Sequence, residues 1–249
     1  MADTTRANGG ASAEIPLAGG VALITGGGRG IGKAIAQRLA KLGAAVSICG
    51  RSTEPLMSTA PELRALGVRV HAQTADVTRP GDIASLVEST EKELGPITIL
   101  VNNAGIGGFG PFHEKSEEEW DRVLNTNLKS VFLVSRAVAP AMIRRGGGDI
   151  INISSLAGKN TFAGGGVYCA SKWGLQGLTG CMAEDLRGYG IRVSVICPGS
   201  VATEFSGGGT KDPKKVLTAE DVAHAVGMVA VQGPQSFISE VHLRPVRKP

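Results

Sequence analysis

The stretch "TGGGRGIG", Thr25–Gly32, follows directly on the apolar run that begins at Val21, and the pattern after it is helical. Glycines between a strand and a helix let the backbone approach a pyrophosphate, because free N–H groups and the helix dipole stabilise its charge. Turns collect glycines anyway, but the place of this cluster between strand and helix indicates nucleotide binding. The residues of the turn expected to contact the nucleotide are Gly26, Gly30, Ile31 and Gly32.

The rest of the chain repeats this alternation of short aliphatic runs and helical stretches. Strands are expected at Val21–Thr25, Ala45–Cys49, Val68–Gln73, Ile97–Val101, Asp149–Ile153, Arg192–Cys197 and Glu240–Leu243. Helices are expected at Gly30–Leu42, Pro61–Leu66, Gly81–Leu94, Glu117–Arg145, Val167–Tyr189 and Ala219–Val231. Parallel neighbours need long crossovers, so this regular alternation implies a parallel sheet covered on both faces. We therefore predict a single-domain α/β fold, a doubly wound (Rossmann) parallel sheet of about seven strands with helices on both faces.

The composition fits one α/β domain of ordinary size. The chain has 249 residues, 42% hydrophobic content and 36 glycines, and no apolar run approaches the ~20 residues that cross a bilayer. The first sixteen residues are small and polar, without an apolar stretch that could act as a secretion signal. We expect a flexible tail at residues 1–16, one catalytic domain at 17–249, no membrane association and a cytoplasmic location.

The distribution of charge and the spacing of the cysteines and histidines argue against nucleic-acid binding and against a metal site. The net charge is +4, but the basic residues are scattered and do not alternate with aromatic ones, so no nucleic-acid partner is expected. The four cysteines, Cys49, Cys169, Cys181 and Cys197, show no CxxC spacing, which fits reduced thiols. The four histidines are isolated from one another in the sequence, so no metal site is expected.

The end of the second strand indicates which nucleotide binds. An acidic residue usually follows here when the cofactor has a free 2′-hydroxyl, but this chain has "CGRS", with Gly50 in that place and Arg51 next. Arg29 lies inside the glycine turn. Two guanidinium groups suit a 2′-phosphate, because arginine binds phosphate oxygens with paired N–H donors. NADP (NADPH) is therefore favoured over NAD; the alternative is that both arginines are solvated surface charges, and Glu54 lies nearby.

Six further motifs accompany the glycine turn: "ADV" at 75–77, "NNAG" at 102–105, "NTN" at 125–127, "NISS" at 152–155, "YCASK" at 168–172 and "PGSVAT" at 198–203. With these motifs the chain resembles the short-chain dehydrogenase/reductase family, in its compact branch of about 250 residues and in the manner of 3-oxoacyl-[acyl-carrier-protein] reductases. The motifs span almost the whole chain in the family's order and spacing, which makes the combined resemblance specific.

The resemblance places further residues around the cofactor. Asp76 would bind the adenine amino group, and Thr203 would lie near the nicotinamide carboxamide. The residues that it assigns to the cofactor beyond the glycine turn and Arg51 are Asp76, Val77, Asn103, Ala104, Gly105, Tyr168, Lys172, Pro198, Gly199, Val201 and Thr203. Other roles stay open: Asp76 is also typical of a turn or helix cap, and Asn102 and Asn103 of a turn.

Tyr168 and Lys172 lie four residues apart in an expected helix, so their side chains share one face. A free tyrosine has a pKa of about 10. A nearby ammonium and a positive nicotinamide ring favour the phenolate by direct attraction, so we expect a lowered pKa for Tyr168. Tyr168 would then protonate a carbonyl oxygen as hydride arrives, or act as the base in the reverse direction.

The resemblance also implies the partners of this tyrosine. Lys172 would hydrogen bond the nicotinamide ribose, Ser155 would donate to the developing oxyanion, and Asn127 would hold a water that links Lys172 to solvent. The family spacing of thirteen residues before the tyrosine selects Ser155 rather than its neighbour Ser154. Each residue has an ordinary alternative role: Tyr168 as a packed aromatic, Lys172 as a surface ammonium, Ser155 as a turn hydroxyl and Asn127 as a helix-kink residue.

The sequence gives less information about the substrate than about the cofactor and the reaction. Residues 204–217 form a short expected lid that would leave the cleft open to a long or carrier-tethered substrate, and a 3-oxoacyl thioester reduced with NADPH is the leading candidate. The ending "SEVHLRPVRKP" resembles instead members that act on small hydroxy acids. The alternatives are an NADP-dependent dehydrogenase of a small secondary alcohol, sugar or hydroxy acid, and a non-catalytic nucleotide-binding regulator. The resemblance also implies a homotetramer, or a homodimer, paired through the long helices after Glu117 and Val167.

Overall fold

Seven strands form one parallel sheet in the computed structural model, which describes residues 15–203, 205 and 212–247. The strands are β1 Val21–Thr25, β2 Ala45–Gly50, β3 Val70–Thr74, β4 Ile99–Asn102, β5 Gly148–Ile153, β6 Ile191–Pro198 and β7 Glu240–Leu243. Their order across the sheet is β3-β2-β1-β4-β5-β6-β7, and each neighbouring pair is parallel. The predicted doubly wound α/β sheet is therefore confirmed. The winding reverses between β1 and β4, and the carboxyl ends of strands at such a point leave a crevice for ligands.

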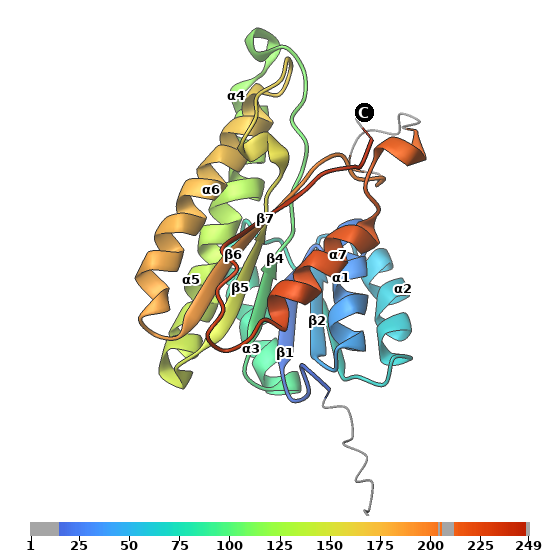
Figure 1. The fold of residues 1–249 in the computed structure, drawn as a ribbon, viewed down its shortest axis with the longest axis vertical. Helices are drawn as coiled ribbons and strands as arrows, with labels where there is room; N and C mark the ends of the chain where they lie inside the picture. The colour runs from blue at the N-terminus through green and yellow to red at the C-terminus, as the bar shows by residue number, and fades with distance from the viewer. Residues whose placement is uncertain (1–14, 204, 206–211, 248–249) are drawn as a thin grey trace, which may run out of the picture.

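Two sets of helices cover the two faces of this sheet (Figure 1). The helices are α1 Gly30–Lys41, α2 Thr53–Arg64, α3 Pro80–Leu94, α4 Glu117–Leu124, α5 Ser130–Arg145, α6 Gly166–Arg187 and α7 Ala219–Ala230. Helices α1, α2 and α7 share one buried cluster that includes Ile35 and Val226, and α3, α5 and α6 share another that includes Leu86 and Met142. Within the described residues, no helix is both long and apolar enough to cross a membrane.

Strand β1 shows why its sequence is apolar throughout. All five of its residues are buried, because both faces of the sheet carry helices. Ala22 and Ile24 belong to the cluster under α1 and α7, whereas Val21 and Leu23 belong to the cluster under α3 and α5. Successive side chains of a strand point to opposite faces, so one aliphatic run stabilises both layers.

Helix α2 begins at Thr53, so the prediction of a start at Pro61 was wrong. Proline is tolerated in a first helical turn, and Pro55 lies there, but Pro61 falls in the helix interior, where its ring removes one backbone hydrogen bond. The buried positions Leu56, Thr59, Ala60 and Leu63 have helical spacing that the two prolines obscured. The helix is also tied to the glycine turn, because the Thr59 hydroxyl donates to the Gly28 carbonyl at 2.9 Å.

The predicted helix Glu117–Arg145 is interrupted by a π-helical turn at Asn125–Lys129. A π turn inserts one extra residue into the helix, and such turns occur frequently at functional sites. Here the wider turn places Thr126 and Asn127 in buried positions beside the carboxyl end of β4. The π turn therefore connects the long helical segment to the crevice.

Candidate active site

A cavity of about 950 Å³ lies along the carboxyl edge of the sheet. It is lined by the glycine turn and by the segments that follow β2, β3, β4, β5 and β6. The predicted site residues that line it are Gly26, Arg29, Gly30, Ile31, Gly32, Arg51, Asp76, Val77, Asn103, Ala104, Gly105, Ser155, Tyr168, Lys172, Pro198, Gly199, Val201 and Thr203. Asn127 does not line the cavity, although its neighbour Thr126 does.

The glycine turn forms a cradle that other residues would fill. Gly26 and Gly30 have φ angles of 67° and 51°, which favour glycine. A Cβ added to Gly32 would lie 2.1 Å from the Gly26 carbonyl oxygen, which no backbone adjustment of a few tenths of an ångström can relieve. Helix α1 has no acidic residue in its first turn and, among the described residues, no side chain that caps it. Its N-terminal N–H groups therefore suit an anion such as a pyrophosphate.

Thr25 and Asn103 hold the turn against the end of β4. The Thr25 hydroxyl accepts from the backbone N–H groups of Asn103 and Ala104, both at 3.0 Å. The Asn103 side chain donates to the carbonyls of Thr25 and Gly26, at 2.9 and 3.3 Å. Asn103 therefore stabilises the turn and lines the cavity as well. Thr25 was not among the predicted site residues, and its only signal in the sequence is a hydroxyl at the end of a buried strand.

Asp76 lies in a turn at the end of β3. One of its carboxylate oxygens accepts from the N–H and the hydroxyl of Thr78, at 2.9 and 2.7 Å. Partial burial alone would raise the pKa of Asp76, but these hydrogen bonds and the nearby Arg51 and Arg79 charges outweigh it and lower the pKa. Asp76 is therefore ionised and acts as a turn residue, and it also lines the cavity beside Arg51.

Ser155 and Tyr168 meet across the cavity floor. Tyr168 lies in the first turn of α6 and is buried, and the Ser155 hydroxyl forms a hydrogen bond with it. Ser155 also accepts from the Ala157 N–H at 3.1 Å and contacts the Pro198 carbonyl at 3.4 Å. The neighbouring Ser154 hydroxyl contacts Gln176 instead, at 3.0 Å, so only Ser155 reaches the tyrosine.

The low pKa expected for Tyr168 depends on a bound nicotinamide as well as on Lys172, so it stays a prediction; in the chain without a cofactor the pKa of Tyr168 is raised. Burial raises the pKa of Tyr168 to about 12, although the hydrogen bond from Ser155 lowers it in part. Lys172 Nζ lies 5.8 Å from the centre of the tyrosine ring and donates to the Ile153 carbonyl at 3.0 Å. Burial also lowers the pKa of Lys172 to about 8. At this distance the Lys172 ammonium does not offset the loss of hydration of a phenolate, so Tyr168 carries its proton.

Asn127 connects the segment after β4 to α6. Its side-chain oxygen accepts from the Ile106 N–H at 2.8 Å, and its amide donates to the Ile106 carbonyl at 2.9 Å and to Ser171 at 3.0 Å. A Cβ on Gly105 would come within 3.3 Å of the Asn127 oxygen and 3.8 Å of Lys172 Nζ. Asn127 and Lys172 thus approach one point beside Gly105, and the water relay between them stays a prediction.

A buried polar network supports this half of the cavity. Asn102 of β4 donates to Ser135 of α5 at 3.0 Å and to Asn152 of β5 at 2.9 Å. Asn152 in turn donates to Thr179 of α6 at 2.9 Å. All four side chains are buried. The network fixes two strands and two helices relative to one another below Ser155 and Tyr168.

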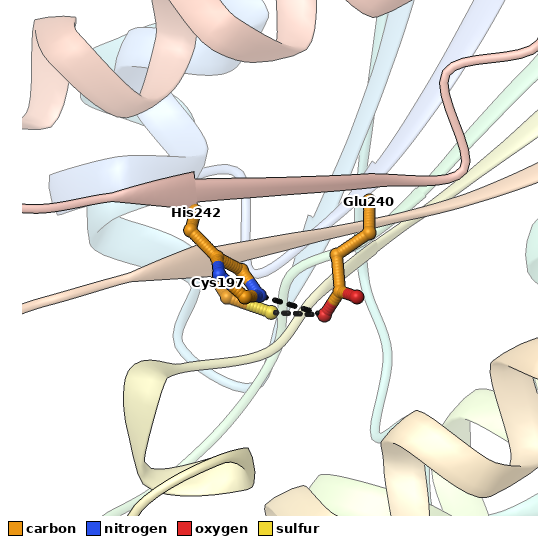
Figure 2. Close-up of side chains that lie close together, drawn as sticks. All are labelled: Cys197, Glu240 and His242. Atoms are coloured by element: carbon orange, nitrogen blue, oxygen red, sulfur yellow. Dashed lines mark hydrogen bonds and ion pairs between the residues drawn. The ribbon is translucent and has the colours of Figure 1, made fainter.

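A separate cluster joins the last two strands of the sheet. Figure 2 shows Cys197, Glu240 and His242 converging, with their candidate metal-ligand atoms within 4.8 Å of one another. The sequence spacing did not predict this grouping, since Cys197 and His242 are paired across β6 and β7. Glu240 already accepts from His242 at 2.9 Å and from the Lys159 ammonium at 2.9 Å. Burial raises the pKa of Cys197 to about 11. The Cys197 thiol therefore stays protonated, and the Glu240 charge is balanced by Lys159. The cluster thus ties β7 to β6 and to the segment after Ser155.

The family model described as short chain dehydrogenase matches residues 20–214. The chain belongs to the short-chain dehydrogenase family. The predicted family and the predicted oxidoreductase class are thereby confirmed. The motifs that carried the prediction, from the glycine turn to "PGSVAT", all fall within the matched residues.

Individual relatives of this short-chain dehydrogenase carry several different names. A "Putative ketoacyl reductase" of Streptomyces coelicolor is 43% identical over 75% of the chain and 72% of its own length. A "Gluconate 5-dehydrogenase" of Gluconobacter oxydans is 40% identical over 76% of the chain and 74% of its own length. The crystal structure of a metagenomic short-chain oxidoreductase in complex with NADP is 43% identical, with a TM-score of 0.83 over 93% of this chain and 100% of that one.

Proposed function

We propose that this short-chain dehydrogenase is an NADPH-dependent carbonyl reductase that transfers hydride to a ketone, with a 3-oxoacyl thioester as its leading substrate. The observation that carries the proposal is the shared cavity, which is lined both by the hydrogen-bonded Ser155 and Tyr168 and by the glycine cradle of α1. A non-catalytic nucleotide-binding regulator would not need a buried proton donor and an oxyanion partner in that position. We also propose that residues 17–249 form one catalytic domain.

The cradle fits the pyrophosphate of a dinucleotide, because added side chains would fill it and the uncapped helix end attracts negative charge. When bound there, NADPH supplies the hydride. Arg29 and Arg51 line the same end of the cavity and offer donors to a 2′-phosphate. A solved relative that is 43% identical is a complex with NADP, which supports the choice of cofactor.

The chain's own residues would complete the reduction. The carbonyl carbon receives the hydride, and Tyr168 gives its proton to the carbonyl oxygen, which yields a secondary alcohol. Ser155 donates a hydrogen bond to the same oxygen as negative charge develops on it. Tyr168 keeps its proton at neutral pH because burial raises its pKa to about 12, so the acid form needed for reduction is the resting form. Lys172 lies beside Gly105 and Asn127, where it would return a proton to the tyrosine.

Two substrate classes compete for this site. The relative named a ketoacyl reductase supports a 3-oxoacyl thioester. The relative named a gluconate dehydrogenase supports the alternative, a small hydroxy acid or sugar that is oxidised with NADP. The expected lid at 204–217 does not distinguish these two substrate classes, since residues 204 and 206–211 lie outside the described residues. The tail expected at 1–16 also lies mostly outside them.

The test is a titration of the purified protein with NADPH and with NADH, followed by turnover on a panel of 3-oxoacyl thioesters, sugars and hydroxy acids. We expect NADPH to bind about tenfold or more tightly than NADH, since each lost charge-assisted contact to the 2′-phosphate costs 1–3 kcal/mol. An Arg51→Ala variant should remove most of this preference and leave the affinity for NADH unchanged. Equal affinities in the parent would contradict the choice of NADPH, and turnover confined to sugars or hydroxy acids would favour the alternative.

Assembly and location also remain proposals. We propose a homotetramer, or a homodimer, paired through α5 and α6, because each helix exposes a large aromatic side chain, Phe132 and Trp173. We propose a cytoplasmic location, which fits the four free cysteines at Cys49, Cys169, Cys181 and Cys197 in the described chain. Light scattering at several concentrations tests the assembly.

A further inference from the structure

Three half-exposed phenylalanines surround the tyrosine at the mouth of the cavity. Phe109, Phe162 and Phe205, here called the aromatic collar, all line the cavity and are 46%, 50% and 41% exposed. The centres of the Phe109 and Phe205 rings lie 5.2 and 5.9 Å from that of Tyr168, and the Phe162 ring lies 6.2 Å from that of Phe109. The chain has six phenylalanines, so half of them gather at one point.

Two rings of the collar, Phe109 and Phe162, pack against the backbone around them. A Cβ on Gly107 would lie 2.8 Å from the Phe109 ring, and a Cβ on Gly165 would lie 2.7 Å from the Phe162 ring. Each ring therefore packs against the bare backbone of a glycine. The two loops that carry these rings are joined by a hydrogen bond from the Gly110 N–H to the Gly164 carbonyl, at 2.9 Å. Rings that are fixed before binding lose little conformational entropy when a ligand arrives.

The position of the collar restricts the substituent next to the reacting carbon. Because the Phe109 and Phe205 rings lie close to the Tyr168 ring, a substituent of a carbonyl whose oxygen reaches Ser155 and Tyr168 would lie near them. Aromatic rings prefer offset or edge-to-face contacts with other rings. A sugar or small hydroxy acid would lose hydration of its hydroxyls against these apolar rings without gaining partners from them.

We infer that the ketone substrate carries an aryl group on its carbonyl carbon, so that the preferred substrate is an aryl 3-oxoacyl thioester rather than an alkyl one. This inference rests on the proposed function and deepens it. The carbonyl oxygen lies at Ser155 and Tyr168, and the aryl ring fills the space between Phe109, Phe162 and Phe205. The polar thioester end then points away from the collar.

The test compares three N-acetylcysteamine thioesters that differ only in the phenyl, cyclohexyl or methyl group on the ketone carbon. They are the 3-oxo-3-phenylpropanoyl, 3-cyclohexyl-3-oxopropanoyl and 3-oxobutanoyl compounds. We expect the lowest KM for the phenyl compound. Phe109→Leu and Phe162→Leu should each raise that KM about tenfold, the size of a lost aromatic pair, and change the KM of the oxobutanoyl compound little. The matched control is Phe112→Leu, since Phe112 is 80% exposed and lies outside the cavity, and this variant should behave as the parent.

A second measurement does not depend on turnover. Calorimetric titration of the NADPH-loaded protein with the two alcohols 3-hydroxy-3-phenylpropanoyl and 3-hydroxybutanoyl thioester should show tighter binding of the phenyl alcohol, again by about tenfold. Equal binding, or collar variants that weaken both alcohols alike, would overturn the role of the collar. Loss of the proposed function has a different signature: no NADPH oxidation with any thioester, whatever the order of the binding constants.

Discussion

The two halves of the cavity are built by different means. On the side of β1 and β2, the geometry comes from the backbone: glycines with positive φ, an uncapped helix end and main-chain groups that bind Thr25. On the side of β4 and β5, it comes from buried side chains that hydrogen bond one another, including Asn102, Asn152 and Asn127. The first half should therefore be sensitive to added atoms, and the second half to removed ones.

The largest expected effect falls on the catalytic half. Tyr168→Phe removes the hydroxyl that meets Ser155 while keeping the ring in contact with Phe109. We expect kcat to fall by about 10²- to 10⁴-fold, the usual contribution of general acid catalysis, with little change in the affinity for NADPH. Stopped-flow oxidation of NADPH and a fluorescence titration measure the two quantities. A variant that binds NADPH much more weakly would show that the halves are not separable.

The matched effect on the cofactor half comes from one added methyl group. Gly32→Ala places a Cβ 2.1 Å from the Gly26 carbonyl oxygen, so the cradle must distort. We expect the affinity for NADPH to fall by about 100-fold or more, which corresponds to the loss of roughly 3 kcal/mol. Gly81→Ala in α3 is the control, because no atom outside its own helix lies within 4 Å of its added Cβ. Alanine there should leave NADPH binding unchanged and stabilise the helix by up to about 1 kcal/mol. Unaltered NADPH binding in Gly32→Ala would show that the glycine turn does not hold the cofactor.

Burial of Lys172 predicts a pH dependence of stability. Its pKa is about 8 in the folded chain and 10.5 as the ordinary value. Between these pH values Lys172 binds more protons in the unfolded chain, so its contribution to the free energy of unfolding should rise with pH, by up to about 3 kcal/mol. Lys172→Met should lack this rise. Urea unfolding of both proteins without cofactor from pH 7 to 10 measures the difference, and a parallel pH profile would show that Lys172 is hydrated.

The smallest expected effect compares a buried and an exposed hydrogen bond. Asn152→Ala removes one buried hydrogen bond from Asn102 and one from Thr179, which should lower the free energy of unfolding by about 1–3 kcal/mol. Thr74→Ala removes an exposed hydrogen bond to Thr53 on the other half and should change it by less than about 0.5 kcal/mol. Denaturant unfolding at one pH measures both. Similar losses of unfolding free energy in the two variants would show that the two halves of the cavity do not differ in their dependence on side-chain hydrogen bonds.

Most of the fold could be predicted because its signals are local. A fully apolar strand next to a glycine turn and a helical period, as at Val21–Thr25, needs no information from elsewhere in the chain. Helix α2 was missed in its first half because prolines at 55 and 61 conceal a helical pattern that tertiary packing stabilises. The π turn at Asn125–Lys129 leaves no mark in the periodicity, since one extra residue is a small phase change.

The residues of the candidate site could be predicted where they belong to family motifs. They could not be predicted where burial or contacts between distant segments determine the site. Ser155 and Tyr168 line one cavity, and their catalytic roles stay predictions. Without a cofactor the pKa of Tyr168 is raised by burial, which cannot be read from the spacing of a phenol and an ammonium. The aromatic collar and the cluster at Cys197 combine residues far apart in sequence. Such groupings depend on which loops and strands become neighbours, and only the folded chain shows them.

One measurement tests most directly whether the two halves act on the same carbonyl. NADPH carrying deuterium at both positions of nicotinamide C4 is mixed with the protein and the 3-oxo-3-phenylpropanoyl thioester, and the alcohol is analysed by mass spectrometry. We predict one deuterium on the carbinol carbon of every product molecule, and almost no product from Tyr168→Phe in the same time. Product without deuterium, or labelled product formed by Tyr168→Phe at the rate of the parent, would contradict the account.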